Sequence, residues 1–501
     1  MIYLGFSIDP MTELLSKQIW SLFRKEARFG SFKDTRPKNK ERFRQKDFKK
    51  NIIVSYIHNS YKTKNMNISI IGLGKLGACM AATYASKGHH VIGVDINQTF
   101  VDAINNGRAP VDEKDLQDTI SLAKDTLRAT TDYTDAISNS DITFIIVPTP
   151  TADDNDGFSA QYVVASCKDI GNALKSKDAY HLVVLTSTLL PCECEKQVIP
   201  TLEEASGKKC GVDFGFCYSP EFIAIGTVIR DLLHPDFFLV GESDKKAGDV
   251  IESFYHSVSD NDVPVRRMSI PSAELTKISV NSFLTMKITY ANMLTEIAEH
   301  IPGVNIDDVT GAVGNDKRIG SAYLRGGLGY GGPCFPRDNR AFAYMAKQRN
   351  VDVPYATKTD TYNYSIIRKS VEKIKANVLD GSAIAFLGLS YKPGTYFSEE
   401  SQAIAIARTL SETGYQIHAW NPGGNRHAET LLSGTSIVFH NSMDTCIAEV
   451  TTVFLSNWDS AFNTLPDVVP SNVTTVIDPW RQYDPAVFSE KIQYIPFGLS
   501  L

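Results

Sequence analysis

The sequence predicts an α/β protein with two open sheets joined by a long helix, and three observations carry this prediction. Residues 66–95 run in the order strand, glycine turn, helix and strand. Residues 272–301 show one helical pattern without an interior proline. Residues 382–422 repeat the order of strand, helix and strand. Alternating strands and helices are typical of sheets with helices on their faces, so we expect two Rossmann-like lobes joined by a long central helix.

Composition places the chain among ordinary globular proteins. Of its 501 residues, 43% are hydrophobic and 22% are charged, which allows two or three domains with their own cores. Because no run of about 18 apolar residues occurs and no secretory signal is recognisable, we expect no membrane partner. The eight cysteines show no disulfide framework, and Cys192 and Cys194 are too close for the usual zinc spacing. We expect a cytoplasmic protein without a metal site.

The first 65 residues differ from the rest in charge. They hold 15 Lys and Arg against 6 Asp and Glu, whereas the whole chain has a net charge of −6. A basic arm can mark nucleic acid or an anionic membrane, but "RPKNKERFRQKDFKK" has neither a base-reading motif nor a clean amphipathic face. We therefore expect a poorly ordered, solvated extension, or sequence translated upstream of a natural start at Met66, and no nucleic-acid partner.

The stretch "ISIIGLGKLGACMAATYASKGHHVIGVD" predicts a dinucleotide-binding βαβ unit. Gly72 allows the tight turn, Gly74 lets a pyrophosphate approach the backbone at the helix N-terminus, and Gly77 lets the helix pack closely on the strand. Asp95 ends the second strand, 18 residues after Gly77, where a carboxylate binds the adenosine ribose and repels the extra phosphate of NADP. The expected cofactor is NAD.

Three further apolar runs, 141–150, 181–188 and 215–222, extend the first sheet. Their polar ends make Thr149, Thr188 and Glu221 candidates for the site, because open α/β sheets bind ligands at the carboxyl ends of their strands. The alternative for the two threonines is a simple turn, which threonine and proline often form after a strand.

On the long helix, for which Ser272 is a possible N-cap, Lys277 and Asn281 stand four residues apart among apolar neighbours. This spacing places both on one face, so an amine and an amide can point together into a cleft. The alternative is a solvated lysine on a helix surface.

The segment "YGGPCFPRD" places Cys334 between turn residues and two opposite charges. An NAD enzyme that oxidises an aldehyde to an acid is well served by a thiol, which forms a thiohemiacetal and then a thioester. Arg337 or Lys277 would lower the pKa of such a thiol. The alternative is a structural cysteine in a turn, since buried thiols are common.

The second α/β unit lacks the glycine fingerprint, because only Gly388 follows its first strand. Its strands are expected in 382–394, 415–422, 451–456 and 474–480, with a helix from about Ser401. This lobe therefore suits a ligand other than a dinucleotide bound in the usual way, and two such lobes imply a cleft between them.

From Met66 onward the chain resembles the nucleotide-sugar dehydrogenase family, the UDP-glucose and GDP-mannose dehydrogenases. The motifs that carry the resemblance occur in family order: "GLGKLG", "VPTPT", "SPEF", "AELTKISVNSFL", "KRIG", "GYGGPCFPRD" and "LSYKPGT". The resemblance implies NAD-dependent oxidation of the C6 alcohol of a UDP-sugar, UDP-glucose first, to a carboxylate. It also implies a homodimer whose contact is formed by the central helical region.

The resemblance assigns roles to single residues. Cys334 would be the nucleophile, Lys277 and Asn281 would stabilise the developing oxyanion, and Asp338 would position water and Lys277. Glu221 would act as general base or acid. The complete expected catalytic set is Cys334, Lys277, Asn281, Asp338, Glu221 and Thr188. The expected NAD contacts are Gly72, Gly74, Leu76, Gly77, Asp95, Thr149 and Thr188.

The expected substrate contacts are Glu221, Lys277, Asn281, Arg318, Tyr330, Gly331, Tyr391 and Lys392, with Arg318 reaching the site from the partner subunit. The expected domains are a basic extension (1–65), an NAD-binding domain (66–271), a central helical domain with the cysteine loop (272–378) and a UDP-sugar-binding domain (379–501).

Four positions depart from the family pattern. Ile225 stands in place of a second acid, Thr186 and Phe100 in place of basic residues, and Glu399 in place of an arginine that often approaches NAD. Fewer positive charges should weaken the attraction for a pyrophosphate. The alternatives are a dehydrogenase of UDP-N-acetylhexosamine or GDP-mannose, or a nucleotide-sugar-binding protein without turnover.

Overall fold

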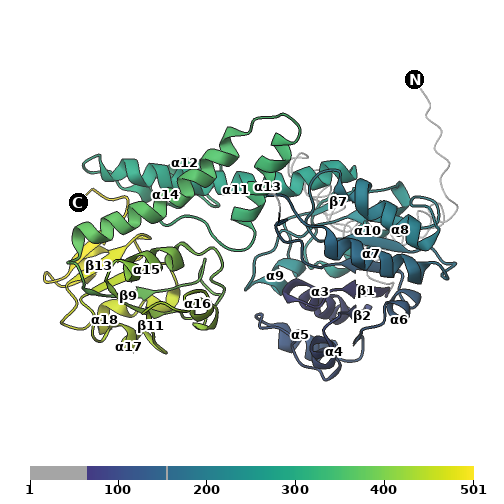
Figure 1. The fold of residues 1–501 in the computed structure, drawn as a ribbon, viewed down its shortest axis with the longest axis horizontal. Helices are drawn as coiled ribbons and strands as arrows, with labels where there is room; N and C mark the ends of the chain where they lie inside the picture. The colour runs from purple at the N-terminus through teal and green to yellow at the C-terminus, as the bar shows by residue number, and fades with distance from the viewer. Residues whose placement is uncertain (1–64, 154–155, 501) are drawn as a thin grey trace, which may run out of the picture. The chain divides into compact units, whose positions relative to one another are not determined.

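A computed structural model describes residues 65–153 and 156–500 of the chain, and residues 64–501 form one compact unit. The basic extension expected at 1–65 lies outside the described residues except for Asn65. Within the described part the chain builds two sheets, one in its N-terminal half and one near its C-terminus (Figure 1).

The first sheet has eight strands in the order β3-β2-β1-β4-β5-β6-β7-β8, and all neighbours run parallel except β6 and β7. The order from β3 to β6 is that of a Rossmann sheet, as the sequence predicts. The strands are β1 (Asn67–Ile71), β2 (His90–Val94), β3 (Leu127–Thr130), β4 (Ile142–Ile145), β5 (Leu182–Leu185), β6 (Gly215–Tyr218), β7 (Phe238–Glu242) and β8 (Val265–Met268). Strands β3, β7 and β8 of this sheet are not anticipated by the sequence patterns.

Helices cover both faces of the first sheet. Alternate residues of the strands enter two separate hydrophobic clusters: Ile70 and Phe144 belong to one, and Ile71 and Ile145 to the other. The helices are α3 (Lys75–Ser86), α4 (Gln98–Asn105), α5 (Leu116–Leu122), α6 (Tyr133–Ser138), α7 (Gln161–Leu174), α8 (Ile199–Ser206), α9 (Val228–Leu233) and α10 (Lys245–Val258). Strands buried on both faces explain why these runs read as continuously apolar.

The long helix α11 (Ile270–Glu299) starts earlier than the sequence suggests. Ser269 occupies the N-cap position instead of Ser272, and Pro271 lies in the first turn. A proline is tolerated there because the first-turn amides have no partner within the helix. After α11 come α12 (Ile306–Asn315), α13 (Phe335–Lys347) and α14 (Pro354–Asn377), and α11 contacts all three.

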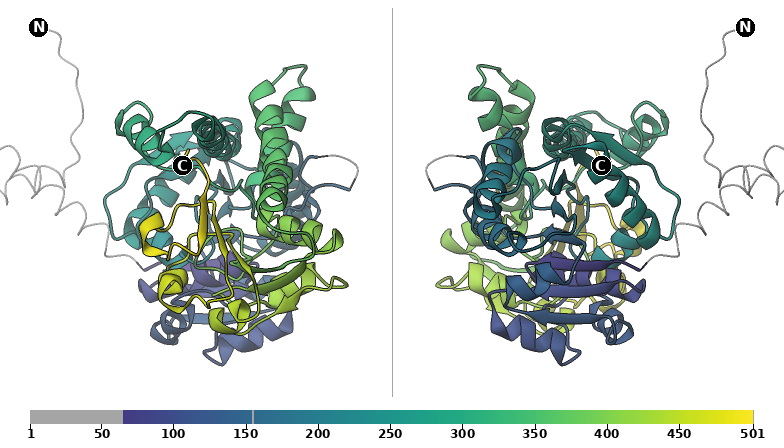
Figure 2. Two further views of the ribbon diagram at one scale, coloured as in Figure 1. Left: turned by 90° about the vertical axis from the view of Figure 1, so that its left-hand side faces the viewer. Right: turned by 90° about the vertical axis from the view of Figure 1, so that its right-hand side faces the viewer.

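The second sheet has six strands, all parallel, in the order β11-β10-β9-β12-β13-β14. It therefore repeats the strand order of the first sheet without its glycine fingerprint. The two views of Figure 2 show its strands in green and yellow. They are β9 (Ala383–Leu387), β10 (Gln416–Trp420), β11 (Val438–Phe439), β12 (Thr452–Leu455), β13 (Thr475–Asp478) and β14 (Gln493–Pro496).

The helices of the C-terminal lobe are α15 (Gln402–Glu412), α16 (Arg426–Leu431), α17 (Met443–Ile447) and α18 (Leu465–Val468). Ser401 is the N-cap of α15, which agrees with the expected start of this helix. Strands β11 and β14 are not expected from the sequence; both lie at the sheet edges, and β11 has only two residues. No helix in the described part of the chain is long and apolar enough to cross a membrane.

Candidate active site

The glycine turn after β1 has the geometry that a bound dinucleotide requires. Gly72 has φ +98°, and a Cβ there would meet the Ile146 carbonyl oxygen at 2.3 Å. A Cβ on Gly77 would meet the Gly72 carbonyl oxygen at 1.9 Å, so the helix–strand approach depends on this glycine. A Cβ on Gly74 would meet nothing within 4 Å, which leaves open space where a pyrophosphate would approach.

Asp95 holds the position expected of the ribose-binding acid. Its Oδ2 accepts a hydrogen bond from the backbone N–H of Leu73 at 2.6 Å, and its Oδ1 accepts one from Asn97 at 2.8 Å. These bonds fix the carboxylate beside the glycine turn. Together with the turn, Asp95 makes a site that fits NAD, with Leu76 partly buried in the first turn of α3.

The loops after β4 and β5 carry Thr149 and Thr188 to the same edge of the sheet. They are tied together by Ser187, whose hydroxyl donates to the Val147 carbonyl oxygen at 2.7 Å and accepts from the Val147 N–H at 3.0 Å. The Thr149 carbonyl oxygen accepts from Nη1 of Arg337 at 3.2 Å. The cofactor-side loops are thereby joined to the segment that follows Cys334.

Lys277 lies on α11 and is buried, with 8% of its surface exposed. Its Nζ donates to the backbone carbonyl oxygen of Glu221 at 2.5 Å and lies 4.5 Å from the ring centre of Phe222. Burial lowers the pKa of the Lys277 ammonium, while the negative charges of Asp338 and Cys334 act in the opposite direction. Lys277 is therefore not the solvated surface lysine of the alternative reading.

Asn281 lies one turn after Lys277 and contacts Asp338 of α13. Its Nδ2 donates to Oδ2 of Asp338 at 2.7 Å, and both residues are buried. The other oxygen, Oδ1 of Asp338, accepts from Nε and Nη2 of Arg337 at 3.0 and 2.8 Å. The Asp338 charge is thus held by an amide and a guanidinium, and the contact with Arg337 is one that sequence reasoning did not assign.

Cys334 occupies the N-cap position of α13, and its side chain is exposed. The surrounding protein raises the pKa of the thiol, first through desolvation and then through the charge of Asp338. Arg337 and Lys277 lower this pKa, as expected, but they do not outweigh the other two effects.

Glu221 follows β6 and is partly buried. Desolvation raises the pKa of its carboxyl group to about 7, against the opposing effect of Lys277. A carboxyl group with this pKa can exchange a proton near neutral pH, which suits a general acid or base.

The cysteine loop packs against residues 391–401 of the C-terminal lobe. A Cβ on Gly331 would meet the backbone oxygen of Glu400 at 2.3 Å, and a Cβ on Gly332 would meet the Tyr391 ring at 2.7 Å. Gly332 also has φ +82° and donates its N–H to the Glu399 carbonyl oxygen at 2.9 Å. The glycine pair is thus required by packing within the chain, and the expected contact of Gly331 with a substrate stays a prediction.

Tyr330 is occupied by contacts with α14. Its hydroxyl donates to Oδ1 of Asp360 at 3.1 Å, and its backbone N–H and carbonyl oxygen both bond Asn363. With 5% of its surface exposed, Tyr330 helps to shape the loop, and its expected contact with a substrate stays a prediction. The neighbouring candidates Tyr391 and Lys392 are partly buried, and desolvation lowers the pKa of Lys392.

Arg318 is not brought to Cys334 by its own chain. Its side chain is 89% exposed and pairs with Asp316, with Nη2 2.5 Å from Oδ2. This placement is compatible with the expectation that Arg318 serves the site of a partner subunit.

The positions that depart from the family pattern lie in different surroundings. The Thr186 hydroxyl is buried and has no hydrogen-bond partner among the described residues, whereas Phe100 packs against the core of the first lobe. Ile225 is partly buried in the loop after Glu221. Glu399 is exposed, and its charge acts on Cys334 and Arg337.

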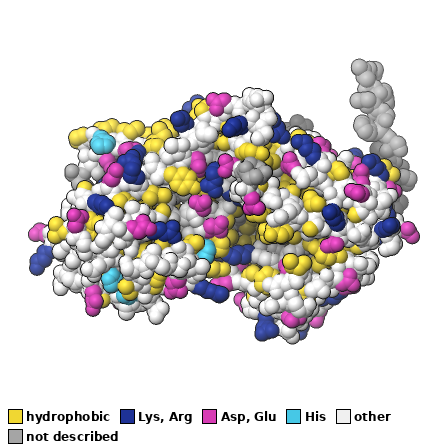
Figure 3. All heavy atoms as spheres, in the orientation of Figure 1, with side chains coloured by type: hydrophobic (Ala, Val, Ile, Leu, Met, Phe, Trp, Pro, Cys, Tyr) yellow, Lys and Arg dark blue, Asp and Glu magenta, His cyan; other side chains and the backbone are white. Residues whose placement is uncertain are grey.

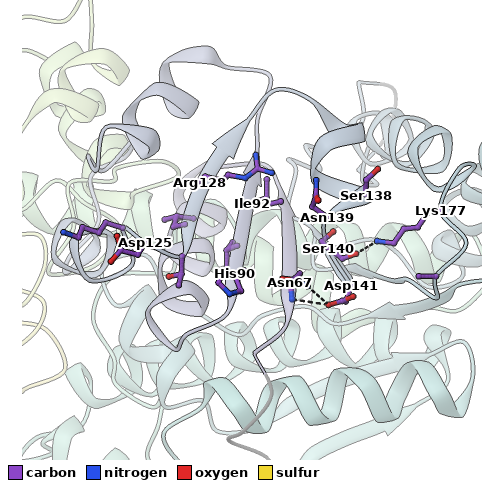
Figure 4. A pocket seen from close by; sticks show the side chains of 15 residues that line it. Asn67, His90, Ile92, Asp125, Arg128, Ser138, Asn139, Ser140, Asp141 and Lys177 are labelled. Atoms are coloured by element: carbon purple, nitrogen blue, oxygen red, sulfur yellow. Dashed lines mark hydrogen bonds between the residues drawn. The ribbon is translucent and has the colours of Figure 1, made fainter.

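Figure 3 shows a hollow near the middle of this face of the molecule, with hydrophobic side chains inside it. A separate cavity of about 740 Å³ lies at the other edge of the first sheet, where β1, β2 and β4 begin (Figure 4). There Nδ2 of Asn67 donates to Asp141 at 3.2 Å, and Lys177 donates to the Ile137 carbonyl oxygen at 2.6 Å. The polar groups of this cavity form hydrogen bonds with their neighbours in the chain, and they lie at the opposite end of the strands from the carboxyl ends, where open α/β sheets bind ligands. The candidate active site is therefore the cluster around Cys334.

A Rossmann lobe with a site for NAD defines the class as an NAD-dependent dehydrogenase. Residues 66–259 match the profile of the UDP-glucose/GDP-mannose dehydrogenase family, NAD binding domain, and residues 271–365 match that family's central domain. The chain belongs to this family and is a nucleotide-sugar 6-dehydrogenase that uses NAD.

Several similar proteins are named for the sugar nucleotide that they oxidise. The GDP-mannose 6-dehydrogenase of Pseudomonas syringae is 35% identical over 418 residues, which are 81% of this chain and 94% of the relative. The UDP-glucose 6-dehydrogenase of Haloferax volcanii is 35% identical over 361 residues, 71% of this chain and 83% of that one. The UDP-glucose dehydrogenase structure from Pyrobaculum islandicum has a TM-score of 0.79 at 29% identity, covering 86% of this chain and 98% of that chain.

Proposed function

We propose that this enzyme oxidises the C6 alcohol of a UDP-sugar, UDP-glucose first, to a carboxylate by way of a thioester on Cys334. The observation that carries the proposal is the position of the exposed Cys334 thiol at the start of α13, where the charges of Lys277 and Asp338 act on it. A simple alcohol dehydrogenase needs no thiol, whereas an aldehyde carried on to the acid uses one.

In the first oxidation, Glu221 is placed to receive the proton of the C6 hydroxyl, since its pKa lies near neutral pH. NAD, which the glycine turn and Asp95 would hold, would supply the acceptor for the hydride from C6. The Lys277 ammonium and the Asn281 amide supply the donors that stabilise negative charge on the reacting oxygen. The aldehyde forms as the C–H bond breaks, and no oxygen atom is added in this step.

In the second oxidation, the Cys334 thiolate adds to the aldehyde carbon and forms a thiohemiacetal. Loss of a second hydride to a second NAD leaves a thioester, and one water molecule then breaks the C–S bond to give the carboxylate and the free thiol. The balance is one alcohol, two NAD and one water to one carboxylate, two NADH and three protons. Asp338, held by Asn281 and Arg337, is placed to orient that water and the ammonium.

UDP-glucose is proposed as the substrate on the basis of similarity to the Pyrobaculum islandicum enzyme and the Haloferax volcanii relative. GDP-mannose is the second candidate, because the GDP-mannose 6-dehydrogenase of Pseudomonas syringae matches a longer part of this chain. The lobe formed by residues 379–501 is proposed to hold the sugar nucleotide, with the partly buried Tyr391 and Lys392 among its contacts.

The test is a panel of sugar nucleotides with NAD, in which NADH is measured per molecule consumed. We expect turnover of UDP-glucose with about two NADH per sugar. Faster turnover of GDP-mannose or a UDP-N-acetylhexosamine would replace the proposed substrate, and about one NADH per sugar would contradict the thioester on Cys334. No NADH with any sugar nucleotide would show a protein without turnover.

We also propose a homodimer formed through α11. Large apolar side chains are exposed along this helix, and Phe283, Tyr290 and Ile297 follow one another at intervals of seven residues, with 57%, 48% and 50% of their surfaces exposed. Residues seven apart lie on one face of a helix, so these three form an apolar stripe that a second copy can cover.

A further inference from the structure

The basic residue inside the glycine fingerprint has an unusual environment. Lys75 is the first residue of α3, directly after the turn of Gly72 and Gly74. Its Nζ has almost no exposed surface and no hydrogen-bond partner among the described residues, while the residue as a whole is only partly buried. A buried ammonium with three unused donors carries a cost that an anion would remove.

Aromatic residues of the C-terminal lobe hold this ammonium. The Nζ of Lys75 lies 3.4 Å from the ring centre of Phe397 and 5.0 Å from that of Tyr396. The Phe397 ring also stacks on His427, with ring centres 4.5 Å apart, and Nδ1 of His427 accepts from the Ser398 N–H at 2.8 Å. The rings are therefore fixed before any ligand arrives, and they place a cation by cation–π attraction.

The carboxylates around Lys75 act on it from a distance. Glu113, Glu399 and Asp112 raise the pKa of the ammonium, but desolvation outweighs them and the pKa is lowered. Glu113 is engaged elsewhere, since Oε1 accepts from the N–H groups of Gly226 and Val228 at 2.8 and 3.2 Å. The ammonium thus lacks a direct anionic partner within the described chain.

The direction of the side chain adds a second line of argument. In an α-helix the Cα–Cβ bonds tilt toward the N-terminus, so a first-turn lysine extends toward the turn that precedes the helix. The N-cap residue Gly74 provides no side chain to the first-turn amides. The same amides and the helix dipole mark the place where the NAD pyrophosphate would lie, and Lys75 is the helix residue that directly follows this turn.

We infer that Lys75 is a cofactor-binding residue of this enzyme: its ammonium turns from the rings of Phe397 and Tyr396, which hold it beside the glycine turn, to bind the NAD pyrophosphate. The cation for the pyrophosphate is thus built into the glycine turn and pre-positioned by the C-terminal lobe. Pre-positioning reduces the side-chain entropy lost on binding. The inference rests on the NAD site and is independent of which sugar nucleotide is oxidised.

The test is direct binding of NADH and ADP-ribose to the full chain by calorimetry, without sugar nucleotide. Lys75→Met and Lys75→Gln should each weaken both ligands about tenfold or more, because a charge-assisted contact is lost, and Lys75→Arg should retain most of the affinity. The weakening should shrink as salt concentration rises. Lys87→Met, at the other end of α3, removes a lysine paired with Asp260 and should leave binding unchanged.

A double-mutant cycle tests the part played by Phe397. Phe397→Leu alone should weaken NADH binding about threefold, and this effect should vanish in the Lys75→Met background. Binding of NADH by Lys75→Met or Lys75→Gln within twofold of the unchanged protein would overturn the inference. Equal effects of Phe397→Leu with and without Lys75 would overturn the pre-positioning by the aromatic pair. Neither outcome depends on turnover, so failure of the proposed sugar oxidation would be seen separately.

Discussion

The Nδ2 of Asn281 donates a hydrogen bond to Oδ2 of Asp338 at 2.7 Å, and this bond joins the central helix to the helix that begins after Cys334. Asp338 has 1% of its surface exposed and Asn281 has 7%. A carboxylate buried to this extent requires partners for both oxygens, which Asn281 and Arg337 provide. The bond therefore sets the position of the Cys334 segment relative to Lys277.

Asn281→Ala should reduce kcat about 10²-fold with a smaller change in KM, because an oxyanion donor is lost and Asp338 keeps only one partner. The buried Asp338 oxygen that loses its hydrogen-bond partner should also lower the free energy of unfolding by about 1–3 kcal/mol. Steady-state kinetics and urea unfolding measure the two effects. Ser282→Ala is the matched control, since the Ser282 hydroxyl donates to Asn339 of α13 at 3.0 Å and tests the helix contact alone. An Asn281→Ala enzyme with wild-type kcat would remove Asn281 from the mechanism.

Cys334→Ser should stop the reaction before the acid is released, because a serine hydroxyl is a far weaker nucleophile at neutral pH than a cysteine thiol. The measurement is NADH and uronic acid formed per sugar nucleotide, and the carboxylate should be absent on the timescale of wild-type turnover. Cys210→Ser, at a partly buried thiol outside the cluster, should behave like the unchanged enzyme. Wild-type acid output from Cys334→Ser would refute the nucleophile assignment.

The pH dependence of kcat/KM should show an acid limb governed by Glu221. As a general base, Glu221 must be deprotonated, so the rate should rise with pH through its pKa of about 7. Glu221→Gln should be slower and should lack this limb. If the limb persists unchanged in Glu221→Gln, another group is the base.

The same pKa gives a stability prediction with a defined sign. Folding raises the pKa of Glu221 from 4.5 to about 7. The charged carboxylate therefore lowers the stability of the folded protein increasingly between these two pH values and fully above pH 7, and it has no effect below pH 4.5. Glu221→Gln should therefore be more stable than the unchanged enzyme at pH 8, by about 1–3 kcal/mol, and much less so at pH 4.5. Thermal unfolding at the two pH values measures the difference. An equal change in Tm at both would show that the effect is not one of titration.

The sequence predicts the fold well where buried strands and glycine spacing dominate. The βαβ unit of 66–95 and the start of α15 at Gln402 are confirmed, because apolar runs and caps are local signals. The sequence analysis does not predict strands β3, β7, β8, β11 and β14, because their pairing depends on the rest of the sheet. The contacts of Lys75 with Phe397 and of Gly331 with Glu400 join segments more than 60 residues apart, so no local pattern predicts them. The basic residue within "GLGKLG" was the signal available for Lys75.

Glu399 should suppress the reactivity of Cys334, because its negative charge raises the pKa of the thiol. Glu399→Gln should increase the rate of Cys334 alkylation by iodoacetamide at pH 7 by about two- to threefold, measured by mass spectrometry of the labelled peptide. Glu400→Gln changes the neighbouring carboxylate, which pairs with Arg340, and should have a smaller effect. Faster labelling of Glu400→Gln than of Glu399→Gln would contradict this assignment of the field at the thiol.

Replacing the apolar stripe of α11 should separate the dimer and abolish turnover together. Phe283→Glu with Tyr290→Glu places two charges on a face that we propose to be covered by the second copy, and light scattering should then give the mass of a monomer. Turnover should be lost if Arg318 acts on the site of the partner subunit, because its own chain keeps it exposed and paired with Asp316.

The sharper test co-expresses Arg318→Ala with Cys334→Ser. Each variant alone should be inactive, whereas a mixed dimer has one site with an intact Cys334 and an intact arginine from the other chain. Random pairing should then restore about a quarter of the wild-type activity. Inactive mixed dimers would show that Arg318 serves the site of its own chain.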